Sequence, residues 1–280
     1  MGTLRACALV ALAALALAAC GSDGSTKVDA MIIVADAAPD APPDAAIPDA
    51  PSYDFSCMND PAPATADADV TIAGTVQEVI LNGITPDVQP AQDATVDACT
   101  GDCIDANLLD TQGPTGATGT FTTDAISTGG APLDGYIRAT KTGNRTTYVY
   151  PPSPLTTSLP NAPVLMFNAT AFSTIVQFLS VKQEMENGTV GLAITDCSDL
   201  PIGDTANLVL SVKQGGVEVT GTDVLDASQL DPAGAGTFLI FNVPPGVTEV
   251  GATYNGMALR AHEVRVEATS TTTTIVRPGY

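Results

Sequence analysis

The stretch GTFLIFNVPPG, residues 236–246, leads from a run of Phe, Leu, Ile and Thr into a turn with two prolines and a glycine. The run is typical of a buried β-strand. Pro244 and Pro245 fix the chain direction, and Gly246 accepts a turn geometry that other residues resist. This stretch therefore predicts a strand that ends in a tight turn.

Similar short runs recur after residue 70, with Gly, Pro, Asp and Asn between them. LVLSV (208–212) and VRVEA (264–268) alternate apolar and polar residues, as half-buried strands do. Many short strands with turns between them predict an all-β fold of sandwich type. Strands are expected at 70–79, 119–123, 135–140, 146–150, 163–167, 189–195, 206–212, 236–242, 248–253, 263–268 and 272–276.

One helix is expected between two sets of strands. In TAFSTIVQFLSVKQEME (170–186), Phe172, Ile175, Val176 and Leu179 recur at helical spacing. The pair Asn187-Gly188 that follows is typical of a helix C-cap. We expect this helix to pack between or against two domains.

The two sets of strands echo each other. IAGTVQE around Gly74 resembles TVGLAIT around Gly191, and GTF recurs at Gly119 and Gly236. In both cases the second copy follows the first by 117 residues. The echo predicts a duplicated unit. We expect two β-sandwich domains in tandem, a first and divergent one at 70–168 and a second at 188–280, joined by the helix at 169–187.

The second unit carries a series of elements in a specific order: Gly191, Pro201-Ile202-Gly203, the FNVPPG turn and a closing strand run at 264–276. This series resembles the carboxypeptidase regulatory-like domains, small sandwiches of the transthyretin (prealbumin) type. The first unit departs from it, with STGGAPLDGYI where the VPPG turn would stand and an insert with two cysteines. The resemblance implies the sandwich fold and an extracytoplasmic setting, and it implies no activity.

The amino terminus predicts export and a lipid anchor. Residues 6–19 are apolar but too few to span a bilayer, which needs roughly 20 residues, and they fit a signal peptide. LAAC (17–20) resembles the lipobox of bacterial lipoproteins, which implies a signal peptide at 1–19 and a lipidated Cys20. In that family, an Asp directly after the cysteine tends to hold the protein at the inner membrane. Gly21 and Ser22 follow Cys20 here, so the resemblance implies the outer membrane. An ordinary signal peptide cut after residue 19 is the alternative.

Residues 20–69 are expected to form a disordered Pro/Ala/Asp-rich tether. Between residues 21 and 70 there are ten Asp and one Lys. Prolines and like charges oppose folding and extend the chain. The apolar stretch VDAMIIVADA (28–37) interrupts this tract, and a short strand docking on the folded part is one reading of it.

The charge balance excludes some partners. The chain has 31 acidic and 10 basic residues and a net charge of −21. Nucleic acids and anionic lipid surfaces both require clustered Lys and Arg. The expected contact with the bilayer is therefore the acylated Cys20, and an envelope protein or a glycan is the candidate further partner.

Four cysteines follow Cys20: Cys57, Cys99, Cys103 and Cys197. An even number in an exported protein predicts two disulfides. A local Cys99–Cys103 bridge with a Cys57–Cys197 staple is one pairing, and the two crossed pairings are equally compatible with the sequence. A zinc site needs about four N or S ligands, and His262 is the single histidine, so neither a metal nor a cofactor is expected.

The sequence contains no G-x-S-x-G elbow, H-E-x-x-H or phosphate-binding loop. His262 is expected to be a packing or surface residue. The insert at 93–110 offers carboxylates for calcium, but their spacing is not that of an EF-hand, and a solvated loop is expected. These carboxylates are Asp93, Asp97, Asp102, Asp105 and Asp110.

The stretch DGYIRATKTGNRTTYVYPPSP (134–154) holds three of the ten basic residues and half of the six tyrosines. Aromatic and basic side chains together bind glycans or proteins, whereas tyrosines packed on one hairpin face are the alternative. The candidate ligand surface is Tyr136, Arg138, Lys141, Arg145, Tyr148 and Tyr150. We predict a non-enzymatic binding or structural module of the bacterial envelope, without catalytic residues. A carboxylate-based hydrolase of surface glycans and an accessory subunit of an envelope complex are the alternatives.

Overall fold

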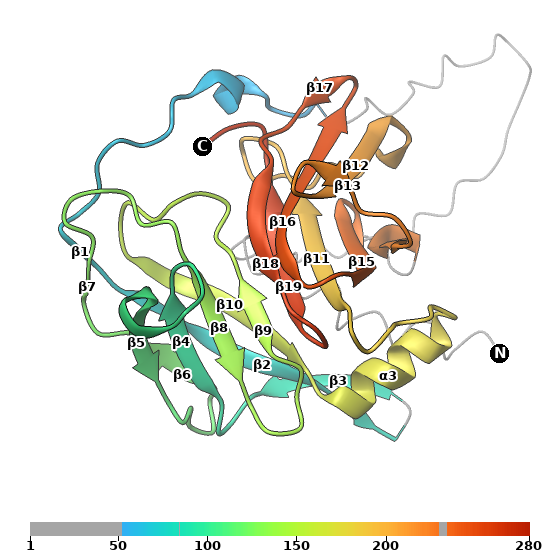
Figure 1. Ribbon diagram of the computed structural model, residues 1–280, viewed down its shortest axis with the longest axis horizontal. Coiled ribbons are helices and arrows are strands. Elements are labelled where there is room, and N and C mark those ends of the chain that lie inside the picture. The colour runs from blue at the N-terminus through green and yellow to red at the C-terminus, as the bar shows by residue number, and fades with distance from the viewer. Residues whose placement is uncertain (1–51, 84, 230–233) are drawn as a thin grey trace, which may run out of the picture.

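The computed structural model describes residues 52–83, 85–229 and 234–280. The described chain consists of β-strands with one α-helix, which confirms the predicted all-β class (Figure 1). The signal peptide, Cys20 and the tether up to residue 51 lie outside the described residues. Within the described residues, no helix has the length and apolar character that crossing a bilayer requires.

A central sheet of eight strands passes through both halves of the chain, in the order β14-β15-β11-β19-β9-β8-β4-β5. The halves meet where β19 pairs with β9 in parallel, with Thr271 opposite Thr147 and Thr273 opposite Val149. The strands are β4 (Thr95–Cys99), β5 (Leu108–Gln112), β8 (Tyr136–Thr140), β9 (Thr147–Val149), β11 (Gly188–Ile194), β14 (Asp223–Asp226), β15 (Thr237–Val243) and β19 (Thr271–Val276).

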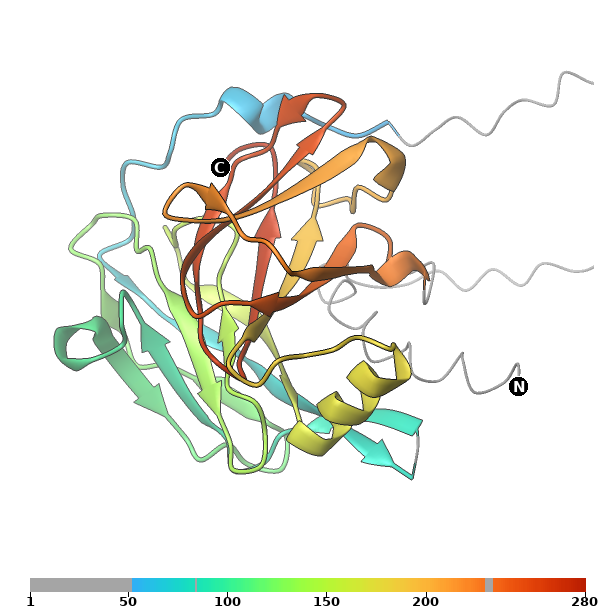
Figure 2. The same ribbon diagram turned by 45° about the vertical axis from the view of Figure 1, so that its right-hand side comes forward.

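Two further sheets cover opposite faces of this central sheet (Figures 1 and 2). Over the first half lie β10 (Leu159–Phe167), β2 (Ile72–Asn82), β3 (Thr85–Pro90) and β6 (Thr120–Thr122). Over the second half lie β12 (Leu208–Gln214), β13 (Val217–Glu218), β16 (Gly246–Tyr254), β17 (Met257–Ala258) and β18 (His262–Val266).

Alternation along the central strands decides which side chains enter which core. In β11, Val190, Leu192 and Ile194 pack toward the second covering sheet. In β4, Val96 and Ala98 pack toward the first covering sheet. Because successive residues of a strand point to opposite faces, one sheet can serve two cores.

The same strand pairings occur in each half. β2 pairs antiparallel with β6 and parallel with β10, as β11 does with β15 and β19. β8 joins β4 and β9, as β16 joins β12 and β18. Phe121 lies opposite Gly74, but Phe238 lies opposite Leu192, so the sequence echo at Gly191 is one residue out of register. The domain boundaries drawn from the sequence stay predictions.

All eleven expected strands overlap observed ones. The strands that the sequence did not predict are β3, β4, β5, β13, β14, β17 and the two-residue β7 (Ile126–Ser127). The helix α3 (Ala169–Phe178) is shorter than predicted. The Asn168 side chain caps its start by accepting hydrogen bonds from the Thr170 and Ala171 amides. Beyond Phe178 the backbone bonds to Asn242 of β15, which accepts from the Glu184 amide and donates to the Lys182 carbonyl. These bonds replace the helical ones expected up to residue 186.

Residues 53–69 form an ordered strap that runs along the outside from the second half to the first (blue in Figure 1). Tyr53 and Phe55 pack against the ring of Tyr254, with centroids 5.5 and 5.7 Å away. The strap includes the 3-10 helix η1 (Ser56–Asn59), and β1 (Asp69–Val70) at its end pairs with β7 (Ile126–Ser127). The predicted disordered tether was therefore too long at its carboxyl end, because aromatic packing holds this part on the body.

Candidate binding cleft

An apolar cleft of about 190 Å³ lies on the face of the central sheet that the second covering sheet leaves free. Its floor consists of small side chains from β11, β15 and β19, among them Gly191, Ala193, Thr237 and Thr273. Its walls come from the start of β10 and from the loop at 151–155, with Leu155 and Leu159. The cleft therefore lies where the two halves meet.

The cleft exists because α3 covers only part of this face. Phe172, Ile175 and Val176 of the helix pack over Leu239 and Phe241. The neighbouring floor has no such cover. Gly191 contributes no side chain, and a Cβ added there would lie 3.2 Å from the Thr273 methyl group, so the floor is close-packed and flat.

The lining of the cleft is almost free of polar chemistry. No Asp, Glu, His, Lys or Arg lines it, and its polar side chains are chiefly threonines and Asn161. Tyr136 and Tyr150 also border the cleft, but their rings belong to the core on the other face of the sheet, where the Tyr150 hydroxyl accepts a hydrogen bond from the Arg265 amide of β18. Concave apolar surface with few polar groups is typical of a binding site for an apolar ligand.

The tyrosines of the predicted ligand surface lie on the opposite face of the sheet and are buried. Tyr136, Tyr148 and Tyr150 are at most 9% exposed. The Tyr136 ring lies 4.8 Å from that of Tyr150 and 5.7 Å from that of Tyr148. Burial raises the pKa of all three hydroxyls. The tyrosines thus follow the alternative in which they pack on one face of the hairpin, because these side chains extend the core of the second half.

The basic residues of the same stretch also have internal partners. Arg138 donates two hydrogen bonds to Asp97, at 3.0 and 2.7 Å. Lys141 forms an ion pair with Glu78 at 2.6 Å. Arg145 donates to the Ser270 carbonyl at 2.6 Å and lies over the Phe172 ring, and burial lowers its pKa to about 10. These contacts stabilise the fold. Since each basic side chain is bound to a different internal partner, the three do not form one binding surface for a ligand.

Glu78 is a buried carboxylate that the sequence analysis missed. It is 5% exposed and accepts hydrogen bonds from Lys141 at 2.6 Å, Asn144 at 2.9 Å and Gln89 at 3.2 Å. Burial alone would raise the pKa of Glu78, but these hydrogen bonds outweigh it and the pKa is lowered. The alternation of IAGTVQE could have revealed it, because Glu78 shares the core-facing side with Val76.

The acidic insert does not converge on one point. Asp97 pairs with Arg138, Asp102 accepts from Asn107, and Asp110 accepts from Gln112. Asp93 and Asp105 lie in positive-φ turns. Across the described part of the chain, no group of three or more His, Cys, Asp or Glu is placed to hold a metal ion. The Cys99–Cys103 disulfide, with Cα atoms 4.9 Å apart, closes the loop.

His262 is a packing residue. It is 8% exposed, its Nδ1 lies 2.6 Å from the Thr274 hydroxyl, and its ring stands edge-on to Tyr150. Burial, with a contribution from Arg260, lowers its pKa to about 4. The imidazole is therefore neutral at physiological pH and faces no nucleophile or carboxylate pair.

No protein-family model matches the chain, and no curated protein matches it. Similar solved structures include the Bacillus anthracis TIE protein, at 13% identity and a TM-score of 0.24, covering 74% of this chain and 34% of that one. The shaft pilin SpaA from Lactobacillus rhamnosus GG has 10% identity and a TM-score of 0.22, with 76% and 98% covered. A fimbrial protein from Bacteroides ovatus has 11% identity and a TM-score of 0.21, with 76% and 49% covered. Likenesses this low assign neither a family nor a function.

Proposed function

We propose that this protein is a lipid-anchored module of the bacterial envelope that binds an apolar partner and has no enzymatic role. The observation that carries the proposal is the cleft, whose lining holds no Asp, Glu, His, Lys or Arg. A glycoside hydrolase would need two carboxylates facing one substrate site. Among the described residues, the buried carboxylates are Glu78, Asp97 and Asp196. Glu78 and Asp97 are each paired with a basic side chain, and Asp196 accepts hydrogen bonds from backbone amides.

The anchor rests on Cys20 and the lipobox-like LAAC, and the acidic tether would space the body from the membrane. The strap supports this arrangement. Cys57 is bonded to Cys197, so tension on the tether reaches the second half through a covalent bond and does not peel the strap away. The outer membrane is the proposed location.

Mass analysis of the mature chain from host membranes tests the anchor. We expect the chain to begin at an acylated Cys20, and we expect Cys20→Ala to remain unprocessed or to be released. Control protein with Cys7→Ala, a change within the signal peptide, should be acylated normally. An unmodified and soluble mature chain would contradict the anchor.

Fluorescence of anilinonaphthalene sulfonate (ANS), an apolar dye, tests the cleft. The mature chain with Cys20→Ser is compared with the same chain carrying Ala193→Phe, which places a ring on the cleft floor. Val209→Phe is the matched control, because Val209 lies 68% exposed outside the cleft. We expect only Ala193→Phe to weaken dye binding. Equal dye binding by all three proteins, also when each of them carries Ile32→Asp and Ile33→Asp in the tether, would contradict the cleft as a binding site.

A further inference from the structure

The cleft leaves part of the central sheet face uncovered. The second half has its covering sheet on the other face, and on this face α3 stops at Phe178 after covering Leu239 and Phe241. Beyond that point Ala193 and Ile275 are half-buried in the floor. Apolar sheet surface of this kind gains stability when an apolar segment covers it, at about 25 cal/mol for each Å² buried.

The chain contains one segment suited to this surface. AMIIVA, residues 30–35, lies between a polar stretch (21–27) and a tract of nearly only Asp, Ala and Pro (36–51), and Asp29 and Asp36 flank it. Its Met, Ile and Val side chains are large, whereas the floor offers Gly191, Ala193 and threonines. Large side chains over a floor of small ones interdigitate without voids, as packed interiors require.

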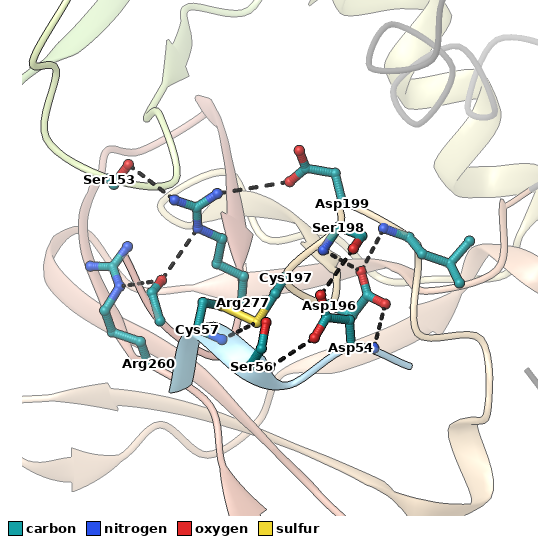
Figure 3. Close-up of a disulfide and its surroundings, with 12 residues drawn as sticks. Asp54, Ser56, Cys57, Ser153, Asp196, Cys197, Ser198, Asp199, Arg260 and Arg277 are labelled. Carbon is teal, nitrogen blue, oxygen red and sulfur yellow. Dashed lines mark hydrogen bonds and ion pairs between the residues drawn. A yellow bond between two sulfur atoms is a disulfide. The ribbon is translucent and has the colours of Figure 1, made fainter. Parts of the chain in front are cut away.

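Charge at one end of the cleft fits the flanking aspartates. Arg277 follows Ile275 on the same face, and its Nη2 lies 3.4 Å from the Ser153 hydroxyl. Its Nη1 lies 3.8 Å from the exposed carboxylate of Asp199, a long ion pair that an aspartate of the segment would share or replace. Arg260 donates to the Pro152 carbonyl in the same loop. Figure 3 shows the Arg277 guanidinium between Ser153 and Asp199, with Arg260 and the Cys57–Cys197 disulfide nearby. Both arginines therefore contact the loop that forms one wall of the cleft, and they do so in a chain with a net charge of −21.

The described chain also begins close to this end. Tyr53 accepts a hydrogen bond from the Gly203 amide, and the Cys57 carbonyl lies against Gly279, two residues after Arg277. The residues between 35 and 52 can span about 55 Å when extended, at about 3.3 Å each. A folded part of this size has a radius of gyration of about 17 Å, so the segment can reach any part of the cleft.

We propose that residues 30–35 lie in the cleft as an extended segment, with Asp29 or Asp36 near Arg277. This inference rests on the proposed function, because it requires the cleft to be a binding site. It names the segment that fills the cleft before a partner binds. An apolar partner must then displace this segment. Displacement frees the tether to lengthen, so partner binding and the distance from the membrane are coupled.

Photocrosslinking tests the contact directly. The probe p-benzoylphenylalanine replaces Ile33 in the mature chain with Cys20→Ser, and Ile47 carries it in the matched control. We expect intramolecular crosslinks from position 33 to peptides containing 155–163 or 191–193, and none from position 47. The absence of such crosslinks from position 33, or equal crosslinking from both positions, would overturn the proposal.

Dye binding separates this proposal from the function on which it rests. We expect Ile32→Asp with Ile33→Asp to raise the ANS affinity of the cleft about tenfold, because a tethered competitor has a high effective concentration. Ala193→Phe should abolish that gain, and Ile47→Asp should leave the affinity unchanged. An Ala193-dependent affinity that the double substitution does not alter would overturn the docked segment alone. Dye binding independent of Ala193 in both backgrounds would overturn the cleft as well.

Discussion

Cys57 and Cys197 lie 140 positions apart in the chain, and a disulfide joins them with Cα atoms 5.7 Å apart. Hydrogen bonds support this link on both sides, because Asp196 accepts from the Asp54 amide at 2.8 Å and Asp54 accepts from the Ser198 hydroxyl at 3.1 Å. The bond joins the end of the tether to the second half (Figure 3). The tether is therefore attached to the folded part next to the carboxyl terminus, since the Cys57 carbonyl lies against Gly279.

Removal of this disulfide should cost much more stability than removal of the local one. In the chain-entropy description, a crosslink across 140 positions stabilises by about 5 kcal/mol and one across four positions by about 2 kcal/mol. We therefore expect Cys57→Ala with Cys197→Ala to lower the free energy of unfolding more than Cys99→Ala with Cys103→Ala. Urea titration of both double variants measures this difference, and equal losses would contradict the expectation.

Glu78→Gln should destabilise the fold because it leaves Lys141 without its counter-charge in a largely buried site. Loss of one partner of a buried ion pair costs about 3–5 kcal/mol, and the 20% exposure of the Lys141 side chain reduces this to about 2–3 kcal/mol. Glu184→Gln is the matched control. Its pair with Lys182 is exposed, so its loss should leave the free energy of unfolding nearly unchanged.

The same glutamate predicts a pH dependence. Its pKa is lower in the folded protein than the ordinary value of 4.5, so its stabilisation is complete above that pH. Stability is lost as the pH falls through the folded pKa, when Glu78 becomes protonated. Between pH 5 and pH 3 the wild type should lose more unfolding free energy than Glu78→Gln. Parallel curves for the two proteins would show that the carboxylate has no such role.

His262 predicts a second pH dependence in a higher range. Its pKa is about 4 in the folded state against an ordinary 6.5, so the unfolded chain binds the proton more readily. Stability should therefore fall as the pH drops below about 6.5, by about 1–2 kcal/mol at pH 5. His262→Gln should remove this difference between pH 7.5 and pH 5. Since the chain has one histidine, an unchanged difference in the variant would refute the assignment.

Gly119 and Gly236 occupy equivalent corners in the two halves. Their carbonyls accept hydrogen bonds from Val76 and Ile194, and their φ angles are 68° and 75°. A Cβ at Gly119 would lie 2.2 Å from the Val76 carbonyl oxygen.

Gly119→Ala should therefore cost more than the about 1–2 kcal/mol that the left-handed conformation alone requires. Gly216→Ala is the control, because Gly216 has a φ of 80° but open space around its Cα. Thermal unfolding of the two variants distinguishes the effects, and equal shifts would contradict the close approach.

The strand pattern was readable because it depends on local alternation, and all eleven expected strands exist. β4 was missed because Asp and Ala are poor strand formers, and only the distant partner Arg138 shows why Asp97 lies within a strand. The helix was predicted too long because the periodicity continues past Phe178, and only the long-range bonds to Asn242 show where it stops. The sequence left open whether the tyrosines form an exposed surface or pack on one face, since it does not show that a second core covers Tyr136, Tyr148 and Tyr150.

The sequence by itself determined the all-β class, the internal echo and the even set of four cysteines, because alternation, turn residues and composition act over a few neighbouring positions. Only the tertiary structure decided the Cys57–Cys197 and Cys99–Cys103 pairing and the shared sheet through β9 and β19. It also decided the apolar cleft beside α3. These features depend on which distant segments meet in space, and the backbone edges and side-chain faces that bring them together are not encoded in any one local stretch.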